Sequence, residues 1–154
     1  MTLWDWALAA YAAEGVSDAC LSLQDHDEQN VCLLLWAGWN AATGRRPDEE
    51  VIEAACDTAR AWETTTLAPL RAVRRTLKLP VSDMEDAARE AVRGRVKAVE
   101  LEAERRLLLA LEALSPTPSG APRPTLDALV ETVRVWSRIV PRPGLIRLAE
   151  RLPA

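Results

Sequence analysis

Apolar residues recur along most of this chain at intervals of three and four, which is the spacing of amphipathic helices. Residues 31–40 are apolar on almost every side, and a helix of that kind belongs at the centre of a bundle. Breaks and capping residues separate eight expected helices, at about residues 3–14, 17–24, 31–40, 47–62, 69–79, 82–114, 125–140 and 145–152. The pattern predicts an all-α helical bundle.

Particular residues set the expected ends of these helices. Residues 25–30 are polar and are expected to form a loop, from which Asp27 can cap the next helix. The β-branched residues 64–66 are expected to break the chain between two helices. Ser82 followed by Glu85 is the sequence of a capping box, so the longest helix is expected to begin near residue 82.

The helix expected over residues 82–114 would be roughly 50 Å long, at the usual rise of about 1.5 Å per residue. Its apolar positions follow one another in steps of four or three and are expected to form one face: Met84, Ala88, Val92, Val96, Val99, Ala103, Leu107, Leu111 and Leu114. Such a helix is longer than a compact domain of 154 residues needs. We therefore expect either a kink at Gly94 or a helix that projects beyond the bundle.

Composition suggests three parts along the chain. Residues 1–114 are expected to form the bundle domain. Residues 115–124 contain four Pro, two Ser and one Gly, which is typical of a linker. Residues 125–154 form a basic amphipathic helical segment, which we expect to pack on the bundle of its own chain or of a neighbour. A groove on a partner protein and a membrane surface are the alternatives.

Charge is divided unevenly, although the net charge is only −4. Residues 1–63 hold twelve acids and three bases, for a net charge of −9, whereas residues 64–80 hold four bases and no acid. This asymmetry predicts either docking between parts of the chain or separate surfaces for a partner. Duplex nucleic acid is disfavoured as a partner, because so acidic a first half would repel a phosphate backbone.

The expected location is the cytoplasm. No apolar run approaches the roughly 18 residues that cross a membrane, so we expect no integral membrane contact. The N-terminal residues lack the basic region of a signal peptide. Cys20, Cys32 and Cys56 are widely spaced in apolar runs, and the chain has a single His. This pattern predicts three buried thiols in a reducing compartment, not a disulfide framework or a zinc site.

The strongest local signal is a basic helix face. Arg71, Arg74, Arg75 and Lys78 follow at i, i+3, i+4 and i+7, so they share one side of a helix that contains no acid. Solvent alone could surround them. An external anion, on a phosphate or an acidic protein, could also bind them, because guanidinium groups match such anions bidentately. The third alternative is an internal acid, and the candidates are Asp25, Asp27, Glu28, Asp48, Glu49, Glu50, Glu53 and Asp57.

Two other groups of residues could bind a ligand. Residues 24–30 include three acids, a His and amides, but adjacent residues rarely all point at one ion, so capping is their expected role. The chain has six Trp and one Tyr. Core packing is the expected role of Trp4, Trp36 and Trp39, and the alternative is that they line a pocket together with Asp25.

Motifs of nucleophilic hydrolases, zinc proteases and phosphate-binding loops are absent. We therefore assign no catalytic residue, no metal and no cofactor.

Several short motifs together resemble a known family. They are Leu3-Trp4-Asp5-Trp6, Tyr11, Gly15-Val16, Ala19-Cys20-Leu21-Ser22-Leu23-Gln24-Asp25, Asn30-Val31, Leu33-Leu34-Leu35-Trp36, Trp39, Trp62 and Pro69-Leu70-Arg71-Ala72-Val73-Arg74-Arg75-Thr76-Leu77-Lys78. Their combination is similar to that of a bacterial family of short proteins classed as a domain of unknown function, over about residues 3–113. The resemblance implies an all-helical bacterial protein of the cytosol and carries no activity. Residues 115–154 lie outside it.

These observations favour a helical interaction or regulatory module. Its partner would be an acidic protein, an anionic surface or a second copy, bound through the basic face or the C-terminal segment. The alternative is a binding protein or an enzyme that holds a small molecule or an anion in a Trp-lined pocket, with Arg71, Arg74 and Arg75 as the anion-binding residues. A cavity in which Trp and Arg side chains converge would favour the alternative.

Overall fold

The computed structural model describes residues 1–154, and every regular element in it is a helix. The elements are α1 (Leu3–Ala12), α2 (Val16–Asp27), α3 (Val31–Ala42), α4 (Glu49–Trp62), the π-helix η1 (Glu63–Leu67), α5 (Ala68–Thr76), α6 (Asp86–Leu114), α7 (Thr125–Trp136) and α8 (Arg142–Arg151). The predicted all-α bundle with one long helix is therefore confirmed.

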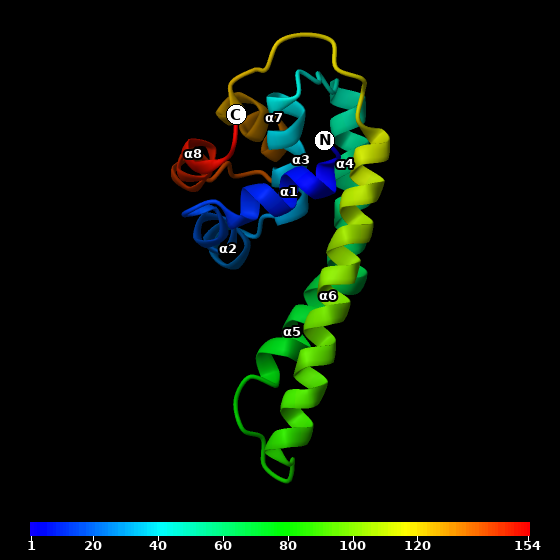
Figure 1. The fold of residues 1–154 in the computed structure, drawn as a ribbon, viewed down its shortest axis with the longest axis vertical. Helices are drawn as coiled ribbons and strands as arrows, with labels where there is room; N and C mark the ends of the chain where they lie inside the picture. Colours follow the sequence, from blue (N-terminus) through cyan, green and yellow to red (C-terminus); the bar gives the residue numbers. More distant parts are fainter.

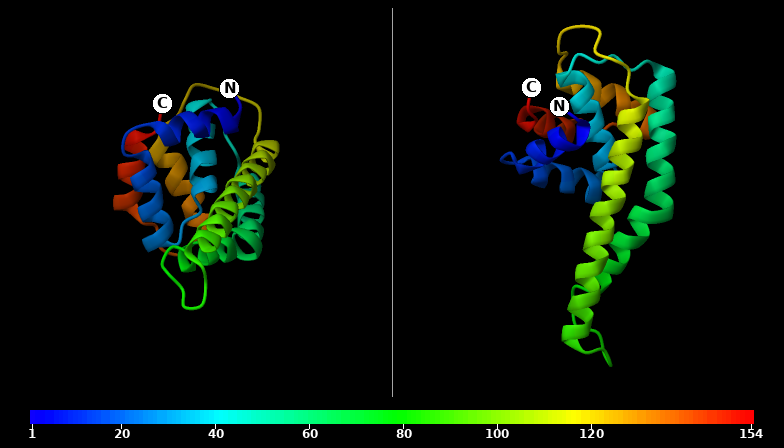
Figure 2. Two further views of the ribbon diagram at one scale, coloured as in Figure 1. Left: turned by 60° about the horizontal axis from the view of Figure 1, so that its bottom comes forward. Right: turned by 45° about the vertical axis from the view of Figure 1, so that its right-hand side comes forward.

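Helix α3 forms the centre of the molecule, as its all-round apolar sequence predicts. Ten of its residues, Cys32–Ala41, are buried. Helices α1, α2, α4, α6 and α7 all pack against it (Figures 1 and 2). Leu34 and Leu35 are only 1% and 4% exposed. A helix surrounded in this way needs no polar face, which explains why its sequence lacks one.

The C-terminal helices belong to the same hydrophobic core. Leu129 and Val133 of α7, together with Leu145 and Leu148 of α8, are fully buried, and α7 lies along α3 (Figure 1). Helix α7 ends at Trp136, four residues earlier than expected, where the Trp136 indole donates to the Glu28 carbonyl oxygen at 3.0 Å. Both chain termini lie on this part of the molecule.

The proline-rich segment of residues 115–124 is bound to the end of α3. The Ser119 amide donates to the Gly44 carbonyl oxygen at 2.9 Å, and the Arg123 amide donates to the Ala41 carbonyl oxygen at 3.0 Å. Arg46 donates from its side chain to the Ala121 carbonyl oxygen at 2.7 Å. These bonds hold the connection in one path and fix where α7 begins.

Residues 64–66 do not break the chain, contrary to the expectation from their β-branched side chains. They form η1, a π-helical turn that joins α4 directly to α5. The Thr64 hydroxyl donates to the Arg60 carbonyl oxygen at 2.9 Å, and the Thr65 hydroxyl donates to the Ala61 carbonyl oxygen at 2.6 Å. The hydroxyl groups therefore bind carbonyl groups of the preceding turn, where the wider π-turn leaves them accessible.

Helix α5 and the first half of α6 form a hairpin that projects from the rest of the molecule (Figures 1 and 2). We call residues 68–100 the arm and the remaining helices the body. Helix α6 begins at Asp86, four residues later than predicted, because Ser82 lies in a turn and the Glu85 side chain forms no cap bond. The helix continues through Gly94 without interruption. Of the two alternatives, the long helix therefore projects.

The apolar face predicted for the long helix is buried only in its second half. Leu107 and Leu111 are fully buried in the body, whereas Val92 and Val99 are 53% and 51% exposed on the arm. In the arm, the side of α6 that faces α5 carries Arg89, which donates to the Leu77 carbonyl oxygen at 3.1 Å. A two-helix arm has no third layer, so it cannot cover every apolar position.

Only the second half of the expected loop of residues 25–30 is non-helical, because residues 25–27 belong to α2. Helix α2 continues through Asp27, and Glu28 ends it in a left-handed conformation with φ of 53°. The cap of α3 is Asn30 and not Asp27, since the Asn30 side-chain oxygen accepts from the Leu33 amide at 3.0 Å. An Asn side chain at this position binds the free amide group of the first turn.

Candidate functional site: a groove at the base of the arm

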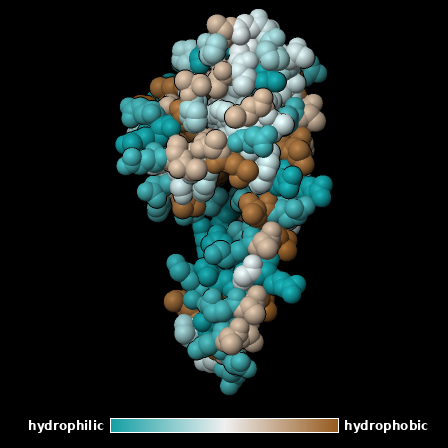
Figure 3. Space-filling model, viewed as in Figure 1, coloured by the Kyte–Doolittle hydropathy of each residue, from teal (hydrophilic) through white to brown (hydrophobic).

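A groove of about 370 Å³ lies where the arm leaves the body, between α1, α2, α3, α5 and α6. Figure 3 shows the surface hollowed at the junction of body and arm. Apolar side chains form its walls: Trp4, Ala7, Leu8, Tyr11, Leu21, Val31, Leu35, Leu101 and Leu108, with Cys32 among them. Polar side chains gather on the α5 and α6 side: Gln24, Arg71, Arg74, Lys97, Glu100 and Glu104.

The arginines of the predicted basic face have internal acidic partners. Arg71 donates to Glu63 at 3.2 Å and to the Gln24 side-chain oxygen at 3.2 Å. Arg74 donates from Nε to Glu100 at 2.7 Å. Neither Glu63 nor Glu100 is among the internal acids that the sequence suggests. Both come close to the arginines only because η1 joins α4 to α5 in one continuous rod and because α6 folds back along that rod. Charged pairs of this kind, only 12–24% exposed, hold α5 against its neighbours.

The basic face divides between three environments. Arg71 and Arg74 line the groove. Arg75 pairs with Asp25 of α2 at 2.5 Å, which was one of the sequence candidates. Lys78 lies beyond the end of α5, is exposed and forms no ion pair. Four cations that share a helix face in sequence are therefore not equivalent in the molecule.

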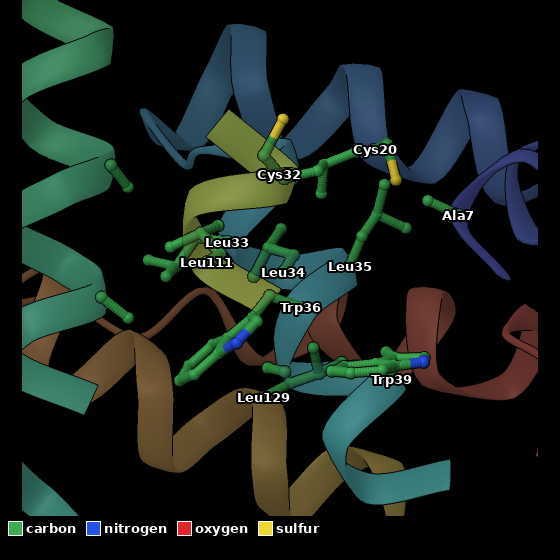
Figure 4. Close-up of a cluster of buried hydrophobic side chains, with 14 of the residues drawn as sticks. Ala7, Cys20, Cys32, Leu33, Leu34, Leu35, Trp36, Trp39, Leu111 and Leu129 are labelled. Carbon is green, nitrogen blue, oxygen red and sulfur yellow. The ribbon is translucent and has the colours of Figure 1, made fainter. Parts of the chain in front are cut away.

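Only one of the three candidate tryptophans lines the groove. Trp4 does so, and the Arg105 guanidinium lies 5.1 Å from the centre of its ring. Trp36 and Trp39 are buried in the core around α3, away from the groove (Figure 4). The Trp36 indole donates to the Ser115 hydroxyl at 2.6 Å, and the Trp39 ring carries the Arg45 guanidinium at 4.0 Å. Core packing accounts for both of these rings.

Glu104 is a further groove residue that the sequence does not single out. It lies in α6 beside the buried Ala103 and Leu107, and its carboxylate forms no hydrogen bond and no ion pair with the protein. Burial is the main reason that its pKa is raised, and the nearby Glu100 raises it further, while Arg71 and Arg74 oppose both effects. The signal in the sequence that could have identified Glu104 is an acid placed next to two core positions of a long amphipathic helix.

The three thiols are unsuited to nucleophilic chemistry. Cys20, Cys32 and Cys56 are free and buried. Burial raises the pKa of Cys20 to about 12 and that of Cys56 to about 11. It raises the pKa of the Cys32 thiol, which lines the groove, well above its usual range. Because the thiolate is the reactive form, the groove holds no activated cysteine.

The acidic residues at the end of α2 lie apart from the groove walls. Asp25 is partnered with Arg75, and Asp27 and Glu28 are exposed. Nowhere in the molecule do three His, Cys, Asp or Glu side chains come together in an arrangement that could hold a metal ion. None of the helices has the length and apolar character needed to cross a membrane.

Comparison with known proteins gives one match. No curated protein and no solved structure is similar to this chain. A family model described as "Protein of unknown function (DUF2390)" matches residues 2–111, which include α1 to α5 and most of α6, and therefore every side chain that lines the groove. Since this match covers well over half of the 154 residues, the chain belongs to the DUF2390 family of proteins of unknown function.

Proposed function

We propose that this protein binds a small amphipathic molecule in the groove between body and arm. The observation that carries the proposal is the convergence of Trp4, Arg71 and Arg74 on one apolar cavity. Its volume of about 370 Å³ falls within the usual range of small-molecule sites, roughly 300–1,000 Å³. Such sites combine apolar walls with a few polar groups that orient the ligand, and the groove has both.

The rim of the groove also supports a ligand. Leu8, Leu21 and Leu101 are 52%, 42% and 55% exposed, although each borders a partly enclosed apolar space. Covering apolar surface stabilises a complex by about 25 cal/mol for each Å² removed from water. A ligand with an apolar part would therefore gain affinity from these side chains, and its polar part would meet the charged groups of α5 and α6.

The uncharged probe 1-octanol tests this proposal by ligand-observed NMR titration of the intact protein. We expect Leu8→Asn combined with Leu21→Asn to weaken binding about tenfold, because two apolar contacts are lost from the rim. The matched control is Leu109→Asn, whose side chain is 45% exposed on α6 outside the groove. Equal affinity in the wild type and the double variant, or no binding at all, would refute the groove as a ligand site.

The second candidate is an interaction module that binds an acidic surface through the arm. Residues 68–100 hold eight bases and five acids, and Lys78 and Arg95 have no ion-pair partner. A second copy offers an acidic surface, since residues 1–63 carry a net charge of −9. Sedimentation of the wild type and of Lys78→Glu/Arg95→Glu tests this candidate. The second candidate is supported if the wild type self-associates in a salt-sensitive way and the variant does not. A wild type that stays monomeric contradicts binding of a second copy through the arm.

A further inference from the structure

We propose that the groove selects an amine: the ligand carries a protonated amino group that meets the Glu104 carboxylate, while its apolar part lies against the groove walls. This inference rests on the proposed function and names the chemical class of the ligand. It differs from the anionic ligand that the sequence predicts from Arg71, Arg74 and Arg75, because all three arginines have carboxylate partners within the protein.

The way in which the charges at the inner side of the groove are paired favours a cation. Arg71 pairs with Glu63 and Arg74 pairs with Glu100, so both guanidinium groups are neutralised within the protein. Glu104 is the third carboxylate there and has no such partner. The remaining cation, Lys97, is exposed and therefore solvated. An incoming anion would have to compete with Glu63 or Glu100 for a guanidinium group that is already paired, whereas an ammonium group would give Glu104 the ion-pair partner that it lacks.

Because of its partial desolvation, the carboxylate of Glu104 is the charged group of the groove that a bound ligand would stabilise most. Glu104 is half-buried, so it loses part of its water and no protein donor replaces that part, which is the main reason that its pKa is raised. An ammonium group supplies up to three donors and one positive charge. Charge-assisted hydrogen bonds are about twice as strong as neutral ones. A ligand amine would therefore gain more at this position than a hydroxyl group.

Aromatic side chains on the α1 wall favour the same class of ligand. Tyr11 and Trp4 both border the groove; burial is the main reason that the pKa of Tyr11 is raised, and the nearby charge of Glu104 contributes a smaller part. Faces of aromatic rings attract cations. The Trp4 ring already has the Arg105 guanidinium 5.1 Å from its centre, which leaves the Tyr11 ring, 38% exposed, for the cation of a ligand. A carboxylate and a Tyr ring in one apolar groove are suited to binding an alkylammonium group.

Binding of an amine should depend on pH in a defined direction. The groups that surround Glu104 are Tyr11 of α1, Cys32 of α3, Glu63 of η1, Arg71 and Arg74 of α5, and Glu100 of α6. The amine needs the ionised carboxylate, and the raised pKa means that ionisation is lost at a higher pH than for a solvated Glu. Affinity for an amine should fall as the pH is lowered through this pKa. Affinity for 1-octanol should not change.

Three probes with the same eight-carbon chain test the inference on the intact protein: octylamine, 1-octanol and octanoate. At neutral pH we expect octylamine to bind at least tenfold more tightly than 1-octanol, and octanoate to bind most weakly. Glu104→Gln keeps the shape of the side chain and should reduce octylamine affinity to that of 1-octanol. Its control is Glu102→Gln, which removes an acid from the same helix outside the groove and should leave the preference intact.

The outcomes separate this inference from the proposal on which it rests. Absence of binding by all three probes, or binding that ignores Leu8→Asn/Leu21→Asn, refutes the groove and the amine together. Rim-dependent binding of 1-octanol without a preference for octylamine refutes the amine alone. An octylamine preference that persists in Glu104→Gln, or that disappears equally in Glu102→Gln, also refutes it, because the attraction would then come from the net charge of −4 and not from this carboxylate.

Discussion

Several titratable side chains of this protein are at least partly buried and have no ion-pair partner, and their pKa values are raised as a result. The thiols of Cys20 and Cys32 are buried and the carboxylate of Glu104 is half-buried, and desolvation is the largest cause of the raised pKa in each case. Desolvation disfavours the charged form, so all three groups are shifted toward their neutral forms. For the thiols this means low reactivity. For the carboxylate it means a group that a ligand could stabilise.

The charge of Glu104 should destabilise the folded protein at neutral pH. A raised pKa in the folded state means that folding favours the protonated acid, so stability is lost as the pH rises through that pKa. We expect Glu104→Gln to raise the midpoint of thermal unfolding at pH 7 and to have no such effect at acidic pH. Unfolding followed by circular dichroism at several pH values tests this, with Glu102→Gln as the exposed control.

The three cysteines should react slowly with a thiol reagent in the folded protein. A pKa of about 11 for Cys56 lowers its thiolate fraction roughly a hundredfold relative to an ordinary thiol, and burial also blocks access. We expect Ellman's reagent to label less than one thiol per chain in native buffer within minutes. In guanidinium chloride all three should react at once. Rapid native labelling of Cys32 would mean that the groove floor is open.

Among the helices, α3 is the most completely buried and α6 is the longest. Helix α3 is buried on all sides, whereas α6 is buried in the body and exposed along the arm. The π-turn η1 lets α4 and α5 continue as one rod beside α6. This continuity carries Arg71 and Arg74 to the groove. The groove residues are therefore positioned by the packing of long helices and not by a loop.

Replacing a leucine at the centre of α3 should be costly. Leu34 is 1% exposed, and removing three of its carbons leaves a cavity in the middle of the bundle. We expect Leu34→Ala to lower the free energy of unfolding by about 2–5 kcal/mol. In contrast, Leu109→Ala on the exposed side of α6 should change it by less than about 0.5 kcal/mol. Similar values for the two variants in denaturant titrations would contradict the central position of α3.

Two glycines should respond oppositely to substitution by alanine. A Cβ at Gly44 would lie 1.9 Å from the Gly120 carbonyl oxygen, and its φ of 69° is unfavourable for other residues, so Gly44→Ala should destabilise the protein. A Cβ at Gly94 would meet nothing within 4 Å in the helical arm. Gly94→Ala should therefore stabilise the protein by about 0.5–1 kcal/mol. Denaturant titrations check both values, and a Gly44→Ala protein of wild-type stability would show that the linker is free to move away.

On the scale of the whole molecule, residues 115–154 complete the fold of the body. The linker is bound to the end of α3, and α7 and α8 cover α3 and α2. Arg60 donates to the Trp136 carbonyl oxygen at 2.7 Å and lies 3.8 Å from the centre of the Trp136 ring. The body thus consists of helices from both ends of the chain, while the arm comes from its middle.

Truncation after Leu114 should expose the core of the body. Leu129, Val133, Leu145 and Leu148 are fully buried against it, so their loss uncovers apolar surface on α3 and α2. We expect the truncated chain to aggregate or to form a new oligomer in light scattering. In the intact chain, Trp136 is 5% exposed and should contribute blue-shifted emission that Trp136→Leu removes. A monodisperse truncated chain of unchanged melting temperature would contradict this.

Part of the site was predictable and part was not. The spacing of Arg71, Arg74 and Arg75 correctly placed them on one helix, and Asp25 was among the acids expected to face them. Glu63 and Glu100 could not be identified as partners, because their positions depend on η1 continuing the rod and on α6 returning beside it. The break predicted at residues 64–66 from their β-branched side chains is absent. The hydroxyl groups of Thr64 and Thr65 instead donate to carbonyl oxygens of the preceding turn and keep the chain helical there.

The all-α class, the central position of α3 and the existence of one long helix can all be predicted from the amino-acid sequence. These features follow from the period and width of apolar faces, which local spacing records directly. Which parts of those faces are covered depends on how the helices pack in the folded molecule. That packing leaves Val92 and Val99 exposed on the arm, pairs Arg71 and Arg74 with Glu63 and Glu100, and leaves Glu104 without a partner in the groove. Pairing and desolvation depend on distances between residues far apart in the chain, and no local pattern encodes those distances.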